Sequence, residues 1–374
     1  MFVNNSSNFG SSILFVGDYK PDALATRPPF AVDSHLVVNL ECAFEFEESG
    51  ISSKAHAIVY KKDMLNKVAQ GGFSVVNVAN NHVGDAGVAS FDSSLVKLRE
   101  ITGLSIAGLH ESPIVEIRLQ GIRCGVIACL EPCRARLRKL TKEEEVEGLI
   151  LAARESYDRL FVTPHWGKEG EYCLNHSPRQ RALAKKWIEA GADAVIGHHP
   201  HVIQPMNYVA GKPVFYSLGN YQFDHEESSD FPETKIGLAV MWRPGGRREA
   251  DIWDWRPVRF EKNRVSELAS DELRNWNELF SELCTSKTPV SKLALWLQWA
   301  RRVGPIYIPK SKKSWKKRLK RKWLTFDRAI WLVWCIHPMT LLLTLGALIP
   351  CPVAEKQRAK WEQIVNYKGN TSKS

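Results

Sequence analysis

Three histidines follow one short apolar run, and this arrangement constrains the chain more than any other stretch. The run is Ala194–Ile196, Gly197 closes it, and His198, His199 and His201 come next. A short apolar run bounded by glycine predicts a buried strand that ends in a tight turn. Open α/β sheets gather ligand sites at the carboxyl ends of their strands. The histidines therefore predict a metal site at such an end, and a surface loop of solvated rings is the alternative.

Four other short apolar runs also end in polar groups that can bind a metal. The groups that follow them are Asp18, Glu41, the pair Asn81–His82, and His165. Each group alone has an ordinary explanation, as a turn residue or a satisfied polar side chain. Their repeated position after apolar strands favours a common site. The four runs are 13–16, 36–39, 75–78 and 160–163.

Helical patterns alternate with these strands. One helix is predicted to start with Pro178 at its first position and to end at Gly191, which is the usual asymmetry of helix ends. Thr141 and Glu144 have the spacing of a capping box. The alternation predicts an α/β fold with a mixed sheet or two packed sheets. The predicted helices are 90–101, 141–156 and 177–190, and a hairpin is expected over 114–129.

The chemistry of the candidate ligands narrows the choice of metal. Mixed oxygen and nitrogen donors suit Mn, Fe or Zn better than Ca or a thiolate-bound metal. Two carboxylates, an amide and several imidazoles are enough for two divalent ions. Such pairs of ions lie about 3.5–4 Å apart and activate a bridging water.

The order and spacing of these pieces resemble the CapA family of capsule and poly-γ-glutamate biosynthesis proteins. That family in turn resembles the calcineurin-like metallophosphoesterases. The resemblance extends over residues 11–240 and implies an α/β fold, a two-sheet β sandwich flanked by helices, with metals at the strand ends. The matching pieces are GD at 17–18, NLE at 39–41, ANNHVGDAG at 79–87, IAGLH at 106–110, PHWG at 164–167, QRALAKKWIEAGADAVIGHHPHVIQ at 180–204 and KPVFYSLGNYQFD at 212–224.

The resemblance also implies a role for each candidate residue. Asp18 would bind the first metal, Glu41 would bridge, and the second metal would take Asn81 and His165. The set of implied metal ligands is completed by two of the three clustered histidines, taken as His199 and His201 with His198 as the spare, although which two bind stays open. His82 would be the general acid that protonates the leaving group, with Asp85 orienting it and raising its pKa.

The sequence departs from the family pattern in two places. Tyr19-Lys20-Pro21 follows the GD pair, and the histidine of a GDxH pattern is missing there. After His165-Trp166-Gly167 the family tends to show x-Glu-Tyr, whereas this chain has 168–172 KEGEY. The role of Glu169 or Glu171 and full hydrolytic competence stay open.

The positive charge is concentrated in the C-terminal part. Residues 301–374 contain 17 Lys and Arg against 3 Asp and Glu, although the whole chain has a net charge of only +10. The basic segment 309–328 would attract anionic membrane lipid. Residues 329–349 contain no Asp, Glu, Lys or Arg, and their length suffices for a bilayer core of ~30 Å, while Pro338 favours a kinked, re-entrant or interfacial segment. The positive-inside rule places the main domain on the cytoplasmic side.

These patterns predict a domain of CapA type at 11–264, a helical extension at 265–308, the basic segment 309–328, an apolar membrane-associating segment 329–350 and a polar tail 351–374. The expected function is a dinuclear-metal hydrolase of a phosphoester or related bond in surface-polymer synthesis. The alternative is a non-catalytic, membrane-associated component that binds or organises an acidic polymer. No nucleic-acid partner is expected, because the basic stretch lacks a folded module or a stripe of stacking aromatic residues.

Overall fold

The computed structural model describes the body of the chain and one isolated residue beyond it. The described residues are 12–28, 30, 33–46, 57–131, 137–167, 171–223, 232–245, 250–261, 264–285 and 364.

The first sheet has eight strands and contains the N-terminal end of the body. Its order is β16-β15-β14-β1-β2-β5-β6, and β13 pairs with β1. The strands β1, β2, β5, β6 and β13 pair with one another in parallel. On the other side β14 pairs antiparallel with β1, and β15 and β16 continue this antiparallel part. Their bounds are β1 Ser12–Tyr19, β2 Ser34–Leu40, β5 Val75–Asn77, β6 Ser105–Ala107, β13 Asn220–Gln222, β14 Ile236–Arg243, β15 Ile252–Glu261 and β16 Arg264–Glu267.

The second sheet has six strands in the order β11-β12-β10-β9-β8-β7. The predicted hairpin is confirmed as β7–β8, and Gln120 and Gly121 at its tip both have positive φ, as a tight two-residue turn requires. A small separate sheet pairs β3 Ala43–Glu45 with β4 Val59–Lys61. The bounds of the six strands are β7 Ile114–Leu119, β8 Ile122–Leu130, β9 Arg159–His165, β10 Ala194–Ile196, β11 Met206–Val209 and β12 Lys212–Phe215.

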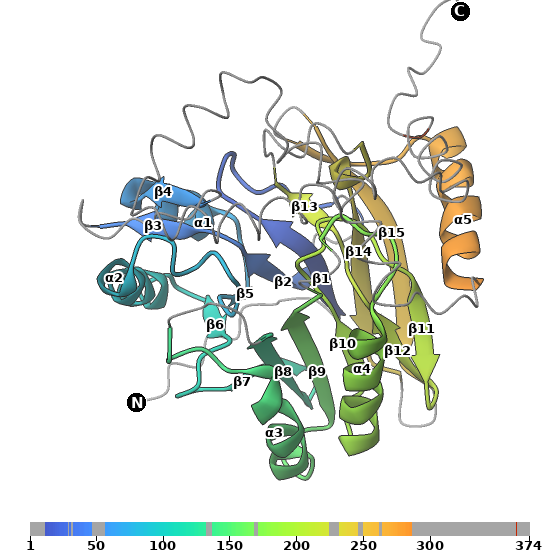
Figure 1. The fold of residues 1–374 in the computed structure, drawn as a ribbon, viewed down its shortest axis with the longest axis horizontal. Helices are drawn as coiled ribbons and strands as arrows, with labels where there is room; N and C mark the ends of the chain where they lie inside the picture. Colours follow the sequence, from blue (N-terminus) through green and yellow to red (C-terminus); the bar gives the residue numbers. More distant parts are fainter. Residues whose placement is uncertain are drawn as a thin grey trace, which may run out of the picture.

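The two sheets pack face to face, and helices cover their outer faces (Figure 1). Side chains alternate between the two faces along β1: Phe15 belongs to the core between the sheets, whereas Leu14 belongs to the outer cluster that includes residues of α2. The outer face of the second sheet is covered by α3 and α4, with Trp187 as a large buried contact. The predicted α/β class, a two-sheet sandwich flanked by helices, is confirmed. The helices are α1 Leu65–Gln70, α2 Val88–Arg99, α3 Val146–Ala153, α4 Pro178–Ala190 and α5 Ser270–Thr285.

The predicted start of the helix at 141–156 is wrong. A 3-10 helix, Glu143–Glu145, precedes α3, which begins at Val146. Thr141 does not cap it, because its backbone N–H donates to Gly108 O and its backbone oxygen accepts from Leu130. These bonds hold Thr141 beside the end of β8. By contrast, Ser177 and Gln180 form a full capping box at the start of α4, and Gly191 ends that helix in the left-handed conformation.

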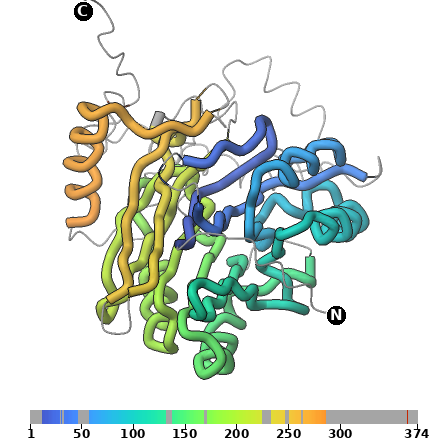
Figure 2. The backbone as a smooth tube through the Cα atoms, turned by 180° about the vertical axis from the view of Figure 1, so that it is seen from behind, coloured from blue at the N-terminus to red at the C-terminus, as the bar shows by residue number. Residues whose placement is uncertain are grey.

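The C-terminal part of the described chain packs on the edge of the sandwich. Figure 2 shows α5 standing beside the strands, as Figure 1 does from the other side. Its Trp276 and Phe280 join the core between the sheets, as does the fully buried Ile364. The Ile364 backbone oxygen accepts a hydrogen bond from Arg259 Nη2 at 2.8 Å. The chain therefore returns to the same body at residue 364.

The remaining predictions for the C-terminal part, the basic segment 309–328, the apolar segment 329–350 and the polar tail, lie outside the described residues apart from Ile364. Among the described residues, no helix combines the length and the apolar character needed to cross a bilayer.

Candidate metal centre

The first sheet brings Asp18 and Glu41 together at the carboxyl ends of its parallel strands. Asp18 pairs in register with Asn39 on β2 and with Asn220 on β13. Glu41 follows β2 directly and donates its N–H to Tyr19 O at 2.9 Å. The tight approach of β13 explains the glycine before Asp18, because a Cβ on Gly17 would lie 2.0 Å from Gly219 O.

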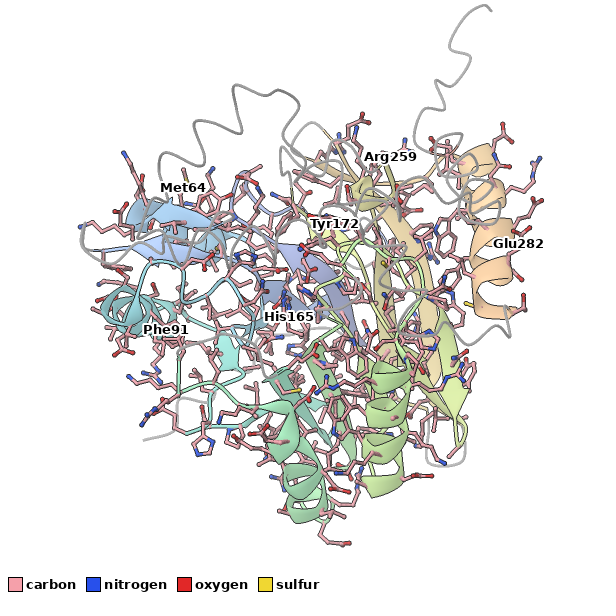
Figure 3. The ribbon with its side chains drawn as sticks, in the orientation of Figure 1. Met64, Phe91, His165, Tyr172, Arg259 and Glu282 are labelled. Atoms are coloured by element: carbon pink, nitrogen blue, oxygen red, sulfur yellow. The ribbon has the colours of Figure 1, made fainter. Side chains whose placement is uncertain are left out.

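The second sheet delivers the histidines to the same place. His165 is the last residue of β9 and forms a bridge with His198, which follows β10. His199 and His201 both have positive φ, +98° and +58°, a conformation that costs non-glycine residues about 1–3 kcal/mol. Figure 3 shows His165 in the interior, between the ends of the blue strands and the green ones. Such strain at a cluster of polar groups is typical of functional sites.

Asn39 lies at the centre of the cluster. Its Nδ2 is 2.8 Å from Asp18 Oδ1, 3.3 Å from Glu41 Oε2 and 3.2 Å from His165 Nδ1. The side chains of Asn39, Asp18 and Glu41 are completely buried, and His165 is 2% exposed. The amide thus holds two buried carboxylates and one imidazole around one point.

Two groups of ligand atoms in this cluster are close enough to hold a metal. In each group the atoms lie within 4.8 Å of one another, and Glu41 belongs to both. The first group adds Asp18 and His165, and the second adds His199 and His201. A carboxylate shared between two ligand groups fits a site for two neighbouring ions.

Unsatisfied atoms in the cluster fit a bound cation. Within the described part of the chain, Glu41 Oε1 and His198 Nδ1 are buried and form no hydrogen bond. Glu41 Oε1 lies 3.4 Å from His165 Nε2 and 3.7 Å from His201 Nε2. Buried polar atoms are nearly always satisfied, and buried charges are paired or coordinate metals. The residues therefore fit divalent cations bound by mixed oxygen and nitrogen donors.

The two carboxylates respond oppositely to their surroundings. Burial raises the pKa of Asp18, but its contacts with His198 and His201 outweigh burial and hold the pKa well below its usual range. Burial raises the pKa of Glu41 well above its usual range, and the charge of Asp18 raises it further. A cation beside Glu41 would favour the ionised form that these effects oppose.

The pKa values of the imidazoles of His165 and His201 are also shifted in opposite directions. Burial and the neighbouring His199 lower the pKa of His165 well below its usual range. Burial alone would lower the pKa of His201, but the carboxylates of Glu41 and Asp18 raise it to about 10. A neutral His165 is the form that binds a metal.

Asn81 reaches the cluster through His165. Its Oδ1 lies 2.6 Å from His165 Nε2. The structure therefore brings together all six predicted metal ligands: Asp18, Glu41, Asn81, His165, His199 and His201.

His82 and Asp85 form a dyad beside the cluster. His82 Nδ1 lies 2.7 Å from Asp85 Oδ2, and both residues are buried. Asp85 Oδ2 also accepts from the N–H of Ile58 at 2.9 Å. Asn80 links the dyad to the cluster, because its Oδ1 accepts the His82 N–H at 3.1 Å while its Nδ2 lies 3.4 Å from Asn39 Oδ1. A carboxylate that can only accept keeps the proton on His82 Nδ1.

Sequence reasoning missed three contributors. Asn39 is part of the NLE piece at 39–41, and its position at a strand end was the available signal. His198 was set aside as the spare, yet its Nδ1 lies 3.3 Å from Asp18 Oδ1. Asn220 Oδ1 lies 3.0 Å from His201 Nδ1, and the sequence signal was its position after the apolar run 214–218. Of the two residues left open after His165, Glu171 lies close enough for its charge to raise the pKa of His201.

The chain is similar to curated proteins of capsule synthesis. It is 33% identical over 255 residues to the capsule biosynthesis protein CapA of Bacillus anthracis. This alignment covers 63% of this chain and 58% of that protein. It is 29% identical over 274 residues to the PGA biosynthesis protein CapA of Bacillus subtilis, covering 67% of this chain and 71% of that protein. The chain thus spans little more than half the length of the first relative.

Solved structures share low identity with the chain. A novel phosphatase from Mycoplasma pneumoniae matches with a TM-score of 0.44 and 12% identity, covering 67% of this chain and 96% of that one. A 5'-nucleotidase precursor from Thermus thermophilus matches with a TM-score of 0.36 and 11% identity, covering 58% and 44%.

A family match covers the part of the sequence that carries the cluster. Residues 12–225, more than half of the chain, match the family described as bacterial capsule synthesis protein PGA_cap. The five residues of the two ligand groups, Asn81 and the His82–Asp85 dyad all fall inside this range. The chain belongs to the PGA_cap family of bacterial capsule synthesis proteins.

Proposed function

We propose that this protein is a dinuclear-metal hydrolase that cleaves a phosphoester or related bond during synthesis of a surface polymer of the poly-γ-glutamate type. The observation that carries the proposal is Glu41, a fully buried carboxylate common to two ligand groups, with one oxygen that forms no hydrogen bond in the described structure. Membership of the capsule synthesis family supports the setting in polymer synthesis.

Two divalent ions, Mn, Fe or Zn, would supply an activated water and polarise the phosphoryl oxygens. Asp18, Glu41 and His165 would hold one ion, and Glu41, His199 and His201 the other. Asn81, whose Oδ1 lies at hydrogen-bond distance, 2.6 Å, from His165 Nε2, would add its amide oxygen beside the first group. Asn39 keeps the two carboxylates and His165 oriented around this point.

The dyad would handle the proton of the leaving group. Asp85 fixes the proton on His82 Nδ1 and stabilises the imidazolium, so that Nε2 is the atom that donates. Donation to the leaving oxygen is general acid catalysis. Because Asp85 is also held by the Ile58 N–H, the ring is fixed in direction before substrate binds.

The experiment is metal analysis of the purified protein, combined with hydrolysis of a generic phosphodiester and a phosphomonoester in the presence of Mn²⁺. We expect bound metal and hydrolysis of at least one ester, both lost in Glu41→Gln. Wild-type protein that binds metal but hydrolyses neither ester would reject the catalytic role.

A second function, binding or organising an acidic polymer without catalysis, is favoured by two observations. Residues 301–374 carry a large excess of positive charge, and the sequence after His165 departs from the family pattern. The variant His82→Asn separates the two functions, because it leaves a binding role intact. Full polymer production by a stable His82→Asn protein would favour the binding role.

We also propose that the protein contacts anionic lipid through the basic segment 309–328, with the main domain on the cytoplasmic side. Protease treatment of intact cells tests the orientation: digestion of the main domain there would refute it.

A further inference from the structure

The end of β9 that carries His165 is held by backbone hydrogen bonds on both sides. On one side the His198 N–H donates to Pro164 O at 2.9 Å, and the Trp166 N–H donates to His198 O at 3.3 Å. On the other side Glu131, the residue after β8, donates its N–H to His165 O at 3.1 Å. The position of the imidazole therefore depends on residues outside β9.

The side chain of Glu131 strengthens one of these attachments. Its Oε2 accepts the Gly167 N–H at 2.8 Å, and its Oε1 accepts from Arg179 Nη1 at 2.7 Å. Gly167 has φ +83°, and a Cβ there would lie 2.9 Å from Gln180 Nε2. Glu131 thus holds the peptide groups on both sides of Trp166, the residue that follows His165.

Arg179 in turn holds Glu131. It lies in the first turn of α4 and also forms an ion pair with Glu143 of the 3-10 helix before α3. The carboxylates are largely buried, with side-chain exposures of 13% for Glu131 and 6% for Glu143, while the arginine is 35% exposed. A guanidinium presents several donors in a fixed plane, which suits two carboxylates at once. Hydrogen bonds between such ionised groups are stronger than neutral ones.

We infer that Arg179, acting through Glu131 and the Gly167 amide, positions His165 for metal binding. Arg179 contacts Glu131 and Glu143, which are not among the candidate ligands, so it is a positioning residue. Its loss would free the carboxylate that fixes the Gly167 peptide, and the imidazole would lose its set direction toward Asp18 and Glu41. Groups that orient metal ligands typically contribute 10–100-fold to metal affinity.

The inference rests on the proposed function and predicts an effect confined to one of the two ligand groups. His165, whose backbone oxygen accepts from Glu131, belongs to the group with Asp18, whereas His199 and His201 belong to the other group. We expect Arg179→Gln to weaken one Mn²⁺ binding step about 10-fold and to leave the other unchanged.

The test is calorimetric titration of the full chain with Mn²⁺ alone, for the wild type, Arg179→Gln and a matched control. Lys186→Gln is the control, because Lys186 lies on the same helix and pairs with Glu147 at 2.7 Å on the exposed surface. We expect the control to bind as the wild type does. Arg179→Lys should restore part of the lost affinity, since it keeps the charge but not the planar fork.

The same titration in a His165→Ala background shows whether Arg179 acts through His165. There Arg179→Gln should cause no further loss. A further loss in that background, equal losses in both binding steps, or an unchanged affinity in folded Arg179→Gln would each overturn the inference. If Arg179→Gln does not fold, Glu131→Gln replaces it, because it keeps an oxygen for the Gly167 amide and removes the ion pair.

The possible outcomes distinguish a failure of the proposed metal binding from a failure of the role of Arg179. Wild-type protein that binds no Mn²⁺ refutes the proposed function and this inference together. If the wild type binds Mn²⁺ and Arg179→Gln binds it with the same affinity, only the inference about Arg179 is refuted.

Discussion

The variant Glu41→Gln should be more stable than the wild type without metal and less stable than the wild type with metal. Glu41 is fully buried beside Asp18, and the ligand atoms of their group lie within 4.8 Å of one another. Two unit charges at that distance repel by about 3 kcal/mol at an effective dielectric constant of ~20. The carboxamide has nearly the same shape but no charge.

Without metal, we expect Glu41→Gln to be as stable as the wild type near pH 4 and more stable at neutral and higher pH. Burial and the charge of Asp18 raise the pKa of Glu41, so ionisation of Glu41 disfavours the folded state. The wild type therefore loses stability as the pH rises above the ordinary range of a glutamic acid, and the variant does not share this loss. The gain for the variant is on the order of 3 kcal/mol, because burial and the charge of Asp18 both disfavour ionised Glu41 while His201 offsets part of this effect.

With metal, the order should invert. A ligand at a hundred times its dissociation constant stabilises the folded state by about 2.7 kcal/mol, and only the wild type keeps the shared ligand. The assay is chemical unfolding at pH 8.5 in EDTA and in Mn²⁺. Glu100→Gln is the control, because Glu100 is exposed and pairs with Lys97 on the surface. The reasoning is refuted if Glu41→Gln is clearly less stable than the wild type in EDTA, or if Mn²⁺ stabilises both proteins equally.

Three further changes test separate parts of the structure. Gly17→Ala should destabilise the fold by about 3 kcal/mol or more and weaken metal binding, because the added Cβ would lie 2.0 Å from Gly219 O. A denaturant unfolding curve identical to that of the wild type would contradict this prediction. Burial lowers the pKa of His176 to about 4, so its contribution is complete above pH 6.5 and is lost as the pH falls toward 4. Between pH 7 and pH 5 the wild type should lose about 2 kcal/mol more than His176→Phe, and equal losses in parallel unfolding curves would reject it. His82→Asn should lower the turnover of an ester with a poor leaving group about 100-fold or more and that of a nitrophenyl ester much less; the same loss on both esters would exclude a general acid.

The sequence was sufficient for the strands that carry the site. Apolar runs such as Ala194–Ile196 are buried on both faces, so their composition alone marks them as strands. The polar groups that follow them could be predicted to meet because parallel strands end at one edge. The family resemblance then supplied the two-sheet arrangement, which local patterns left open.

The central role of Asn39 could not be read from the sequence. It depends on the register of β1 against β2, which sets Asp18 opposite Asn39. Register follows from packing across the whole sheet. The start of α3 was mispredicted for a similar reason, since Thr141 is held by backbone bonds to Gly108 and Leu130 instead of capping a helix. The Arg179–Glu131 contact joins residues 48 positions apart in sequence, so no local sequence pattern predicts it.

The most direct test of the account is the number of metal ions bound per chain in three single variants, measured by elemental mass spectrometry after reconstitution with Mn²⁺. Glu41 is common to both ligand groups, whereas His165 and His199 each belong to one. We predict about two ions in the wild type, about one in His165→Ala and in His199→Ala, and close to none in Glu41→Gln. Equal metal content in the wild type and Glu41→Gln would contradict the shared carboxylate on which the proposal depends.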